Sequence, residues 1–284
     1  MGGSLDNLEI AMFYIMVIAF VVSTVLYWLG MAIKKDIINH MATLAAIIGL
    51  IANTVAIVLR WVITQRPPLT NGYEFILTFC WGIVMIYLFV EFRYKFKALG
   101  SFVMPVPFLL LMFIVMKMGP TERVSGAIPP ALKSQWLTFH VFTAMLAYGA
   151  FAISFGLGIM YLIKTSANTN EKNTKDSWLS HFPHENVLDE LAYKMIGFAF
   201  PMLTLCIVTG AIWANYAWGT YWSWDPKETW SLITWIIYAA YLHARLMYGW
   251  KGKRAAWMAI IGFVAVLFTF FGVNYLLPGL HSYA

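Results

Sequence analysis

The stretch LEIAMFYIMVIAFVVSTVLYWLG, residues 8–30, decides the fold class. Its only charged residue is Glu9. A helix rises about 1.5 Å per residue, so this stretch is long enough to cross a hydrocarbon layer of about 30 Å. A helix that is apolar on nearly every side is most stable inside a bilayer or a protein core. The stretch therefore predicts a first transmembrane helix.

The whole chain has the composition of a membrane protein. Of its 284 residues, 61% are hydrophobic and 11% are charged, whereas soluble domains average about 45–50% and about 25%. The net charge of +6 is attributed to loop topology and not to a nucleic-acid partner. The two cysteines lie far apart inside apolar runs and form no CxxC pair. This pattern excludes a disulfide framework and argues against thiol–disulfide exchange within the chain.

Eight segments are predicted to cross the membrane, and together they form one all-α polytopic domain over residues 1–284. They are residues 8–30, 41–60, 73–92, 99–116, 136–163, 195–216, 230–248 and 256–277. The fourth is short and contains Pro105 and Pro107, which a helix bundle tolerates when neighbouring groups bond the freed backbone. The loop 164–187 is polar and is expected to be a simple connection.

The distribution of basic residues predicts the orientation. Thirteen of the nineteen Lys and Arg residues fall in one set of loops, and six fall in the other set. The basic set comprises residues 31–40, 93–98, 164–194 and 249–255, together with Arg245. Cytoplasmic loops are enriched in Lys and Arg, so this set is predicted to be cytoplasmic. With eight spans, both termini are then external (N-out, C-out).

Five tryptophans fall within WANYAWGTYWSWDPKETW, residues 213–230, on the predicted external face. A single Trp at the end of a span commonly anchors the helix at headgroup level. Here the density of indole rings, interleaved with Asp225, Lys227 and Glu228, favours a surface for a large, flat, amphipathic ligand. Aromatic rings stack on a planar π-system, and polar groups at the rim hold its charged edge.

The stretch WGTYWSWDPKETW (218–230) matches, without a gap or substitution, the WWD signature W-G-x-x-W-x-W-D-P-K-E of haem-handling proteins of cytochrome c maturation. Further matches are PLTN (68–71) followed by Tyr73-Glu74, and LPGLHSYA (277–284). The chain resembles the integral-membrane subunit of the System II cytochrome c synthase (CcsA/ResC type), whose length and eight spans it shares. The six-span haem-delivery relative of System I carries the signature in a shorter protein.

The resemblance implies that haem b is the cargo and that the external WWD segment binds it. The cofactor-binding residues predicted in this segment are Trp218, Trp222, Trp224, Asp225 and Trp230.

The predicted topology sorts the histidines. His140, near the external start of the fifth span, and His281, after the eighth span, lie on the same face as the WWD segment. Taken alone, His140 reads more readily as a hydrogen-bonded packing residue. Two neutral imidazoles can occupy both axial positions of a haem iron, and the resemblance implies this role for His140 and His281.

His243 is thirteen residues into the seventh span counted from Trp230, hence about 20 Å deep. Ionisable groups inside a membrane are costly and mark functional sites. Within the chain the nearest candidate partner is His40, which reads better as an interfacial loop residue. The resemblance implies instead that His243 and a histidine of a ResB/CcsB-type partner subunit hold haem in a transmembrane site. His181 and His184 read as loop residues.

The remaining charged residues are expected to have binding or structural roles. Arg60, Arg66 and Arg123 are expected to be external, where they either pair with haem propionates or serve as ordinary loop charges. Arg245 is expected to reach the cytoplasmic interface. Asp225, Lys227 and Glu228 are expected to shape the WWD loop through local hydrogen bonds and ion pairs.

The function predicted from these features is haem transport and presentation. Haem would reach the external face, where the CxxCH segment of apocytochrome c forms thioether bonds with it. The chain would act within a synthase complex, in a bacterial cytoplasmic membrane or a plastid thylakoid, mainly by positioning. Two other classes stay open: a haem exporter or chaperone that delivers haem without ligating it, as in System I, and a membrane assembly or transport component that binds no haem.

Overall fold

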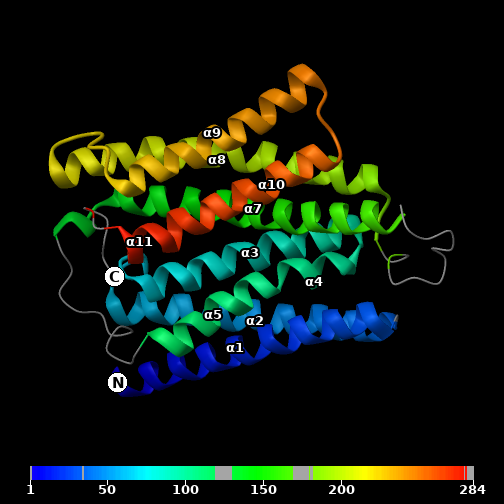
Figure 1. The fold of residues 1–284 in the computed structure, drawn as a ribbon. Helices are drawn as coiled ribbons and strands as arrows, with labels where there is room; N and C mark the ends of the chain where they lie inside the picture. The colour runs from blue at the N-terminus through cyan, green and yellow to red at the C-terminus, as the bar shows by residue number, and fades with distance from the viewer. Residues whose placement is uncertain are drawn as a thin grey trace.

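The computed structural model describes residues 2–33, 35–118, 130–168, 179, 182–277 and 279, and all regular structure in these parts is helical (Figure 1). The long helices are α1 (Gly2–Ile33), α2 (Asp36–Thr64), α3 (Gly72–Tyr94), α7 (Gln135–Asn168), α8 (Glu185–Trp218), α9 (Pro226–Tyr248) and α10 (Lys253–Leu267). The shorter elements are η1 (Lys97–Leu99), α4 (Gly100–Val103), α5 (Pro105–Lys117), η2 (Pro130–Leu132), η4 (Phe268–Gly272) and α11 (Val273–Leu276).

Seven helical segments among the described residues are long and apolar enough to cross a membrane, which confirms the prediction of an all-α polytopic membrane protein. They are Gly3–Ile33, Asp36–Thr64, Gly72–Tyr94, Lys97–Lys117, Gln135–Ala167, Glu185–Trp218 and Lys253–Gly272. The remaining predicted span, 230–248, lies in α9, which has 23 residues. It is long enough to cross but less apolar than the other seven.

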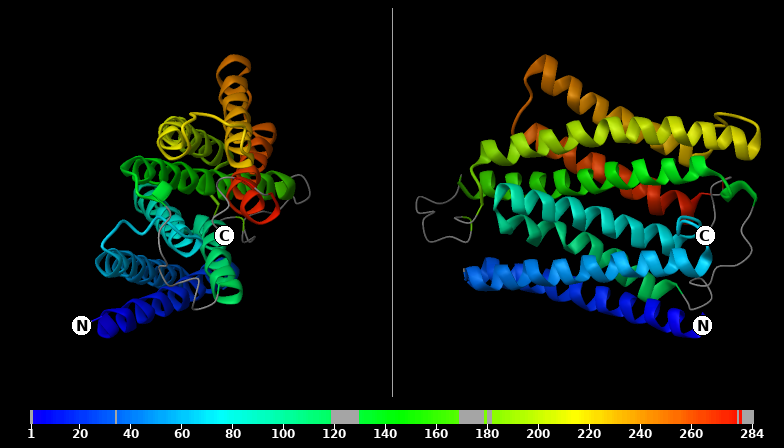
Figure 2. Two further views of the ribbon diagram at one scale, coloured as in Figure 1. Left: turned by 90° about the vertical axis from the view of Figure 1, so that its left-hand side faces the viewer. Right: turned by 180° about the vertical axis from the view of Figure 1, so that it is seen from behind.

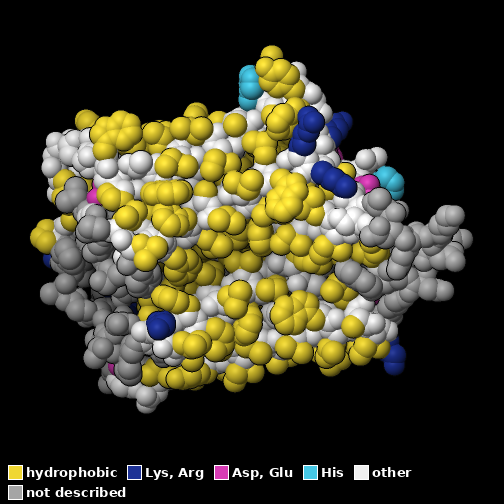
Figure 3. Space-filling view, viewed as in Figure 1, with side chains coloured by type: hydrophobic (Ala, Val, Ile, Leu, Met, Phe, Trp, Pro, Cys, Tyr) yellow, Lys and Arg dark blue, Asp and Glu magenta, His cyan; other side chains and the backbone are white. Residues whose placement is uncertain are grey.

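The long helices lie roughly parallel in one stack that runs from α1 at one edge to α9 at the other (Figures 1 and 2). Their connections gather at two ends. The aromatic end contains residues 218–226 and the first residues of α1 and α7, and the lysine end contains the α1–α2, α3–η1 and α9–α10 turns. Apolar side chains cover most of the face between the two ends (Figure 3). The N-out, C-out orientation stays a prediction.

Two predicted spans are interrupted. The segment 99–116 breaks before Pro105, as the proline suggested, into α4 and α5. The segment 256–277 is divided into α10, the π-helix η4 and α11. Short π-helical turns inside α-helices often lie at functional sites. Here η4 brings Thr269 and Phe270 to a pocket at the aromatic end.

Arg60 and Arg66 are not ordinary loop charges, because both pair with carboxylates; their external position stays a prediction. Arg60 is 5% exposed and contacts Glu9 of α1 at 3.4 Å and Glu74 of α3 at 3.2 Å. Arg66 contacts Glu74 at 2.9 Å. Because a buried charge is tolerated only beside an opposite charge or several hydrogen bonds, these guanidinium groups join α1, α2 and α3. Arg123 lies outside the described residues.

Arg245 is also buried, and its expected position at the cytoplasmic interface stays a prediction. Its side chain contacts Asp189 of α8 at 2.6 Å and Glu190 at 3.5 Å, and its guanidinium lies 4.9 Å from the centroid of the Tyr193 ring. These contacts hold the last turn of α9 against the first turns of α8, so Arg245 fixes the path of α9.

Candidate functional site

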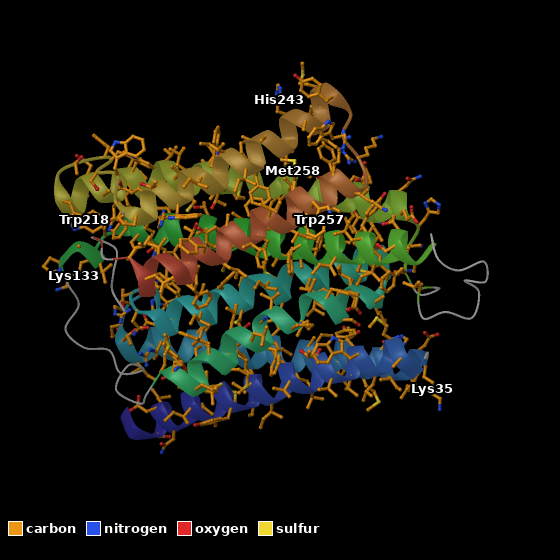
Figure 4. The ribbon with its side chains drawn as sticks, viewed as in Figure 1. Lys35, Lys133, Trp218, His243, Trp257 and Met258 are labelled. Atoms are coloured by element: carbon orange, nitrogen blue, oxygen red, sulfur yellow. The ribbon has the colours of Figure 1, made fainter. Side chains whose placement is uncertain are left out.

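The tryptophan-rich segment forms the turn between α8 and α9. α8 ends at Trp218, and Gly219 closes it with a φ of +79° while its N–H donates to the carbonyl of Asn215. This left-handed conformation strains residues that carry a Cβ but costs glycine little. Gly219 therefore lets the chain turn directly after Trp218, which lies at the aromatic end (Figure 4).

The residues D-P-K-E set the start of α9. Asp225 is the N-cap, and its side chain accepts from the backbone of the first turn. The side chain of Glu228, three residues later, accepts from the Asp225 N–H. The two interactions form a capping box. Pro226 occupies the first turn, where a missing N–H costs nothing. Glu228 also accepts from the N–H of Ser223 at 2.8 Å. Asp225 and Glu228 thus shape the turn locally, as the sequence suggested.

The tryptophans of this segment have different surroundings. Trp213 is 2% exposed, and its indole N–H donates to the carbonyl of Ala131 at 2.8 Å. Trp222 is half-buried and lines a pocket, whereas Trp224 is 68% exposed and has a φ of +60°. Their rings meet edge to face at 5.7 Å. Trp230 packs on Phe268 of η4 at 4.2 Å. Of the two turn tryptophans, Trp222 lines the pocket beside His140 and Trp224 does not line it.

His140 lies in the second turn of α7 and faces α8. Its Nδ1 is 2.8 Å from the carbonyl oxygen of Cys206, and its ring lies 5.9 Å from Trp213 at an angle of 27°. A carbonyl only accepts hydrogen bonds, so Nδ1 must carry the proton and Nε2 keeps its lone pair. Histidines that ligate metals are commonly fixed in this way, through a second hydrogen bond from the other ring nitrogen.

Gly210 allows the close approach of the His140 ring to α8. A Cβ on Gly210 would lie 2.7 Å from Nδ1 of His140 and 2.8 Å from Cε1. Both distances are too short for real contacts, so a larger residue at this position must displace the imidazole.

Gly210→Ala is therefore expected to weaken ligand binding at Nε2 of His140 by roughly tenfold, because loss of the hydrogen bond that orients a ligating histidine has a cost of this size. Gly197→Ala is the matched control, because a Cβ on Gly197 of the same helix meets nothing within 4 Å. The measurement is the haem content of the two purified variants at equal expression. Equal haem content would contradict a ligand role for His140.

Two neighbouring pockets open beside His140. Both are lined by His140, Tyr148, Cys206, Lys227 and Thr269. The first extends between α3, α7 and η4, and the second extends to Trp222. Their cavity volumes are about 90 Å³ and 60 Å³, well below the roughly 300–1,000 Å³ of small-molecule sites. A planar ligand must therefore part these side chains.

Lys227 enters both pockets, which the sequence did not indicate. Its ammonium donates to Oδ1 of Asn274 in α11 at 3.1 Å. Burial lowers the pKa of Lys227 to about 8, against the opposing effect of the Asp225 carboxylate. The side chain remains mostly protonated at neutral pH and is a cation at the pocket wall. No local pattern signals a contact with a residue forty-seven positions away.

The other candidate histidines lie elsewhere. His281 is outside the described residues; Gly279, two positions before it, lies so close to Asp225 that a Cβ there would be 2.6 Å from Oδ1. His243 is exposed near the lysine end of α9 and points away from the stack (Figure 4).

The remaining histidines do not join His243. His40 lies on α2, and α2 lies toward the opposite edge of the stack from α9 (Figure 1), so His40 does not pair with His243. His181 is outside the described residues, and His184 is the N-cap of α8.

The chain matches known proteins along nearly its whole length. Residues 69–281 match the family model described as cytochrome C assembly protein. Proteins called cytochrome c biogenesis protein CcsA are similar: the one from Guillardia theta is 38% identical over 92% of both chains, and the one from Prochlorococcus marinus (strain MIT 9312) is 37% identical over 97% of this chain and 93% of its own. The one from Gloeobacter violaceus is 35% identical over 93% of both.

The fold is also found in a solved structure. A chain called cytochrome c heme lyase CcmF superposes with a TM-score of 0.70 at 15% identity and covers 94% of this chain. The match spans 46% of that chain, so this protein corresponds to about half of it. The likeness supports the arrangement of helices described above.

Proposed function

The chain belongs to the cytochrome c assembly protein family as a CcsA-type, multi-pass membrane protein, and from this premise we propose that it carries haem to the external face and presents it to apocytochrome c. His140 and His281 are the proposed axial ligands of the haem iron. The chemistry of attachment then takes place beside the WWD turn, at the aromatic end.

The hydrogen bond between Nδ1 of His140 and the Cys206 carbonyl, at 2.8 Å, carries the proposal. It places the proton of the neutral imidazole on Nδ1, so Nε2 is the nitrogen suited to bind haem iron. Because Gly279 lies against Asp225 and two residues span at most about 7 Å, the sequence position of His281 suits it to reach the same region.

The pocket walls fit an amphipathic macrocycle. Phe79 and Phe270 offer apolar rings on one side and Trp222 offers an indole on the other, and such rings stack favourably on a planar π-system. The ammonium of Lys227, together with the amide of Asn274, is suited to a propionate.

The proposed attachment needs no thiol from this chain. Each cysteine S–H of the apocytochrome adds across one haem vinyl group: the sulfur bonds one vinyl carbon, and the hydrogen goes to the other. No electrons are gained or lost, so no oxidant is consumed. The chain's part is to hold the macrocycle and shield its iron, and proximity then accounts for the rate.

The exposed position of His243 suits a shared site. An ionisable side chain on the outside of α9 would be costly against lipid. We therefore propose that a ResB/CcsB-type partner subunit covers the outer surface of α9 that carries His243. A histidine of this partner would complete a transit site for haem. This arrangement also accounts for α9 being the least apolar of the long helices, because a partner covers it.

The test is an optical spectrum of the purified protein with and without dithionite. Haem held by two histidines should give a low-spin, six-coordinate spectrum in both oxidation states. Absence of haem absorbance after growth with ample haem would contradict the proposal and favour a membrane assembly role without haem. Haem that is bound but never attached to apocytochrome c, even with the partner subunit present, would favour an exporter.

A further inference from the structure

A third pocket opens at the lysine end, between α2, the end of α3 and the turn into η1. Its cavity volume is about 650 Å³, against about 90 Å³ for the larger pocket beside His140. No residue assigned to haem in the proposed function lines it. It is therefore a separate site, and it is open without any movement of side chains.

Apolar and cationic side chains share its walls. Leu44, Ile47 and Phe92 form the apolar part, and Lys95 and Lys97 bring ammonium groups. Lys95 ends α3 in a left-handed conformation, with a φ of +60°, which is uncommon for a residue that carries a Cβ. The turn that it makes returns the chain over the pocket. The walls are thus suited to an amphipathic anion.

His40 adds an imidazole to this pocket. Its Nδ1 lies 2.7 Å from the backbone carbonyl of Asp36. As with His140, the carbonyl can only accept, so in the neutral imidazole Nδ1 carries the proton and Nε2 keeps its lone pair. The ring is exposed and lines the pocket. A neutral imidazole nitrogen is a ligand for haem iron, and an anion that lacks a metal has no use for its lone pair.

Two carboxylates, Asp36 and Glu91, also line the pocket, and the charge of each is weakened in a different way. Glu91 is 2% exposed, and its oxygens already accept hydrogen bonds from Tyr27 at 2.7 Å, from Thr43 at 2.6 Å and from Tyr87. Its charge is therefore spread over three hydroxyl donors at the pocket floor. Asp36 lies exposed on the first turn of α2, where solvent screens its charge.

We propose that this pocket receives a metalloporphyrin, with its metal at Nε2 of His40 and its carboxylates at Lys95 and Lys97. It would be the point at which haem enters the chain from the lysine end. The inference rests on the proposed function, which makes haem the cargo. An anionic phospholipid would satisfy the apolar wall and the two lysines but would leave the imidazole unused, so the chemistry favours the metalloporphyrin.

The test uses the full chain with the other proposed ligands removed: His140→Gly, His281→Gly and His243→Ala together. This background is purified without haem and titrated with ferric haem, and absorbance reports imidazole ligation. We expect residual binding, and we expect His40→Ala to weaken it on the order of tenfold to a hundredfold. His184→Asn is the matched control, because His184 lies at the same end, outside this pocket, and asparagine preserves the N-cap.

Two further measurements separate the metalloporphyrin from a lipid. Iron-free protoporphyrin should bind the background and its His40→Ala variant equally, because it lacks the metal. Lys95→Gln with Lys97→Gln should weaken haem binding together with protoporphyrin binding.

Equal dissociation constants for haem with and without His40 would overturn the proposal. So would a lysine double variant that loses co-purified phosphatidylglycerol while its haem titration stays unchanged, since that outcome identifies a lipid site. Neither result bears on the wild-type spectrum that tests the site at His140.

Discussion

Replacing His140 by glycine is expected to convert the bound haem from a six-coordinate, low-spin form to one with an open coordination position. The substitution removes the imidazole and leaves a cavity of its size between α7 and Gly210 of α8. External imidazole can enter that cavity, so titration with imidazole should restore the low-spin spectrum. Cytochrome c yield should fall on the order of a hundredfold, the cost of a misplaced reactant, and recover in part with imidazole.

The control separates an axial ligand from the surface that holds the macrocycle. Trp222→Ala should also lower haem retention, because Trp222 lines the pocket, but imidazole should not rescue it. Trp224→Ala should have a smaller effect, because Trp224 is 68% exposed and lies off the pocket. A His140→Gly variant that keeps the wild-type spectrum and yield without imidazole would show that His140 is a packing residue.

The number of long helices and the approximate position of most of them were predictable from the sequence, because a bilayer constrains the length of each span. An apolar run must reach about 20 residues to cross, and the run 73–92 lies between Asn71-Gly72 and Arg93, close to the limits of α3. The break before Pro105 was predictable for a similar reason, since proline cannot donate a backbone N–H. The π-helix η4 was not predictable, because FTFFG reads as a continuation of an apolar helix.

The candidate site was only partly readable from the sequence. The sequence identified His140 and the WWD turn, since residue type and signature are local. It did not identify the two features that orient the His140 imidazole, which are the carbonyl of Cys206 and the missing side chain of Gly210. Both depend on how α7 packs on α8. Lys227 was assigned to the turn alone for the same reason. Long-range pairing, not residue type, supplies what was missing.

The match PLTN followed by Tyr73-Glu74 shows how such pairing hides within a motif. Glu74 lies in the first turn of α3 and accepts from the backbone N–H of Thr70 at 2.8 Å. Asn71 caps the same helix by accepting from the Glu74 N–H at 2.8 Å. The loop thus folds around one carboxylate. Arg60 and Arg66 reach the same carboxylate from α2 and the loop that follows it, a contact that no spacing in the sequence reveals.

Glu74→Gln is therefore expected to destabilise the aromatic end on the order of 3–5 kcal/mol, the usual result of leaving a buried charge without its partner. The carboxylate is fully buried and faces two guanidinium groups. Arg60 keeps its contact with Glu9, so an amide at position 74 leaves one positive charge without a partner in a buried site. The measurement is the midpoint of thermal unfolding in detergent. Lys194→Gln is the control: it breaks an ion pair at 3.6 Å whose side chains are 52% and 51% exposed, and such pairs contribute about 0–1 kcal/mol. Equal midpoints for the two variants would contradict a structural role for the Glu74 cluster.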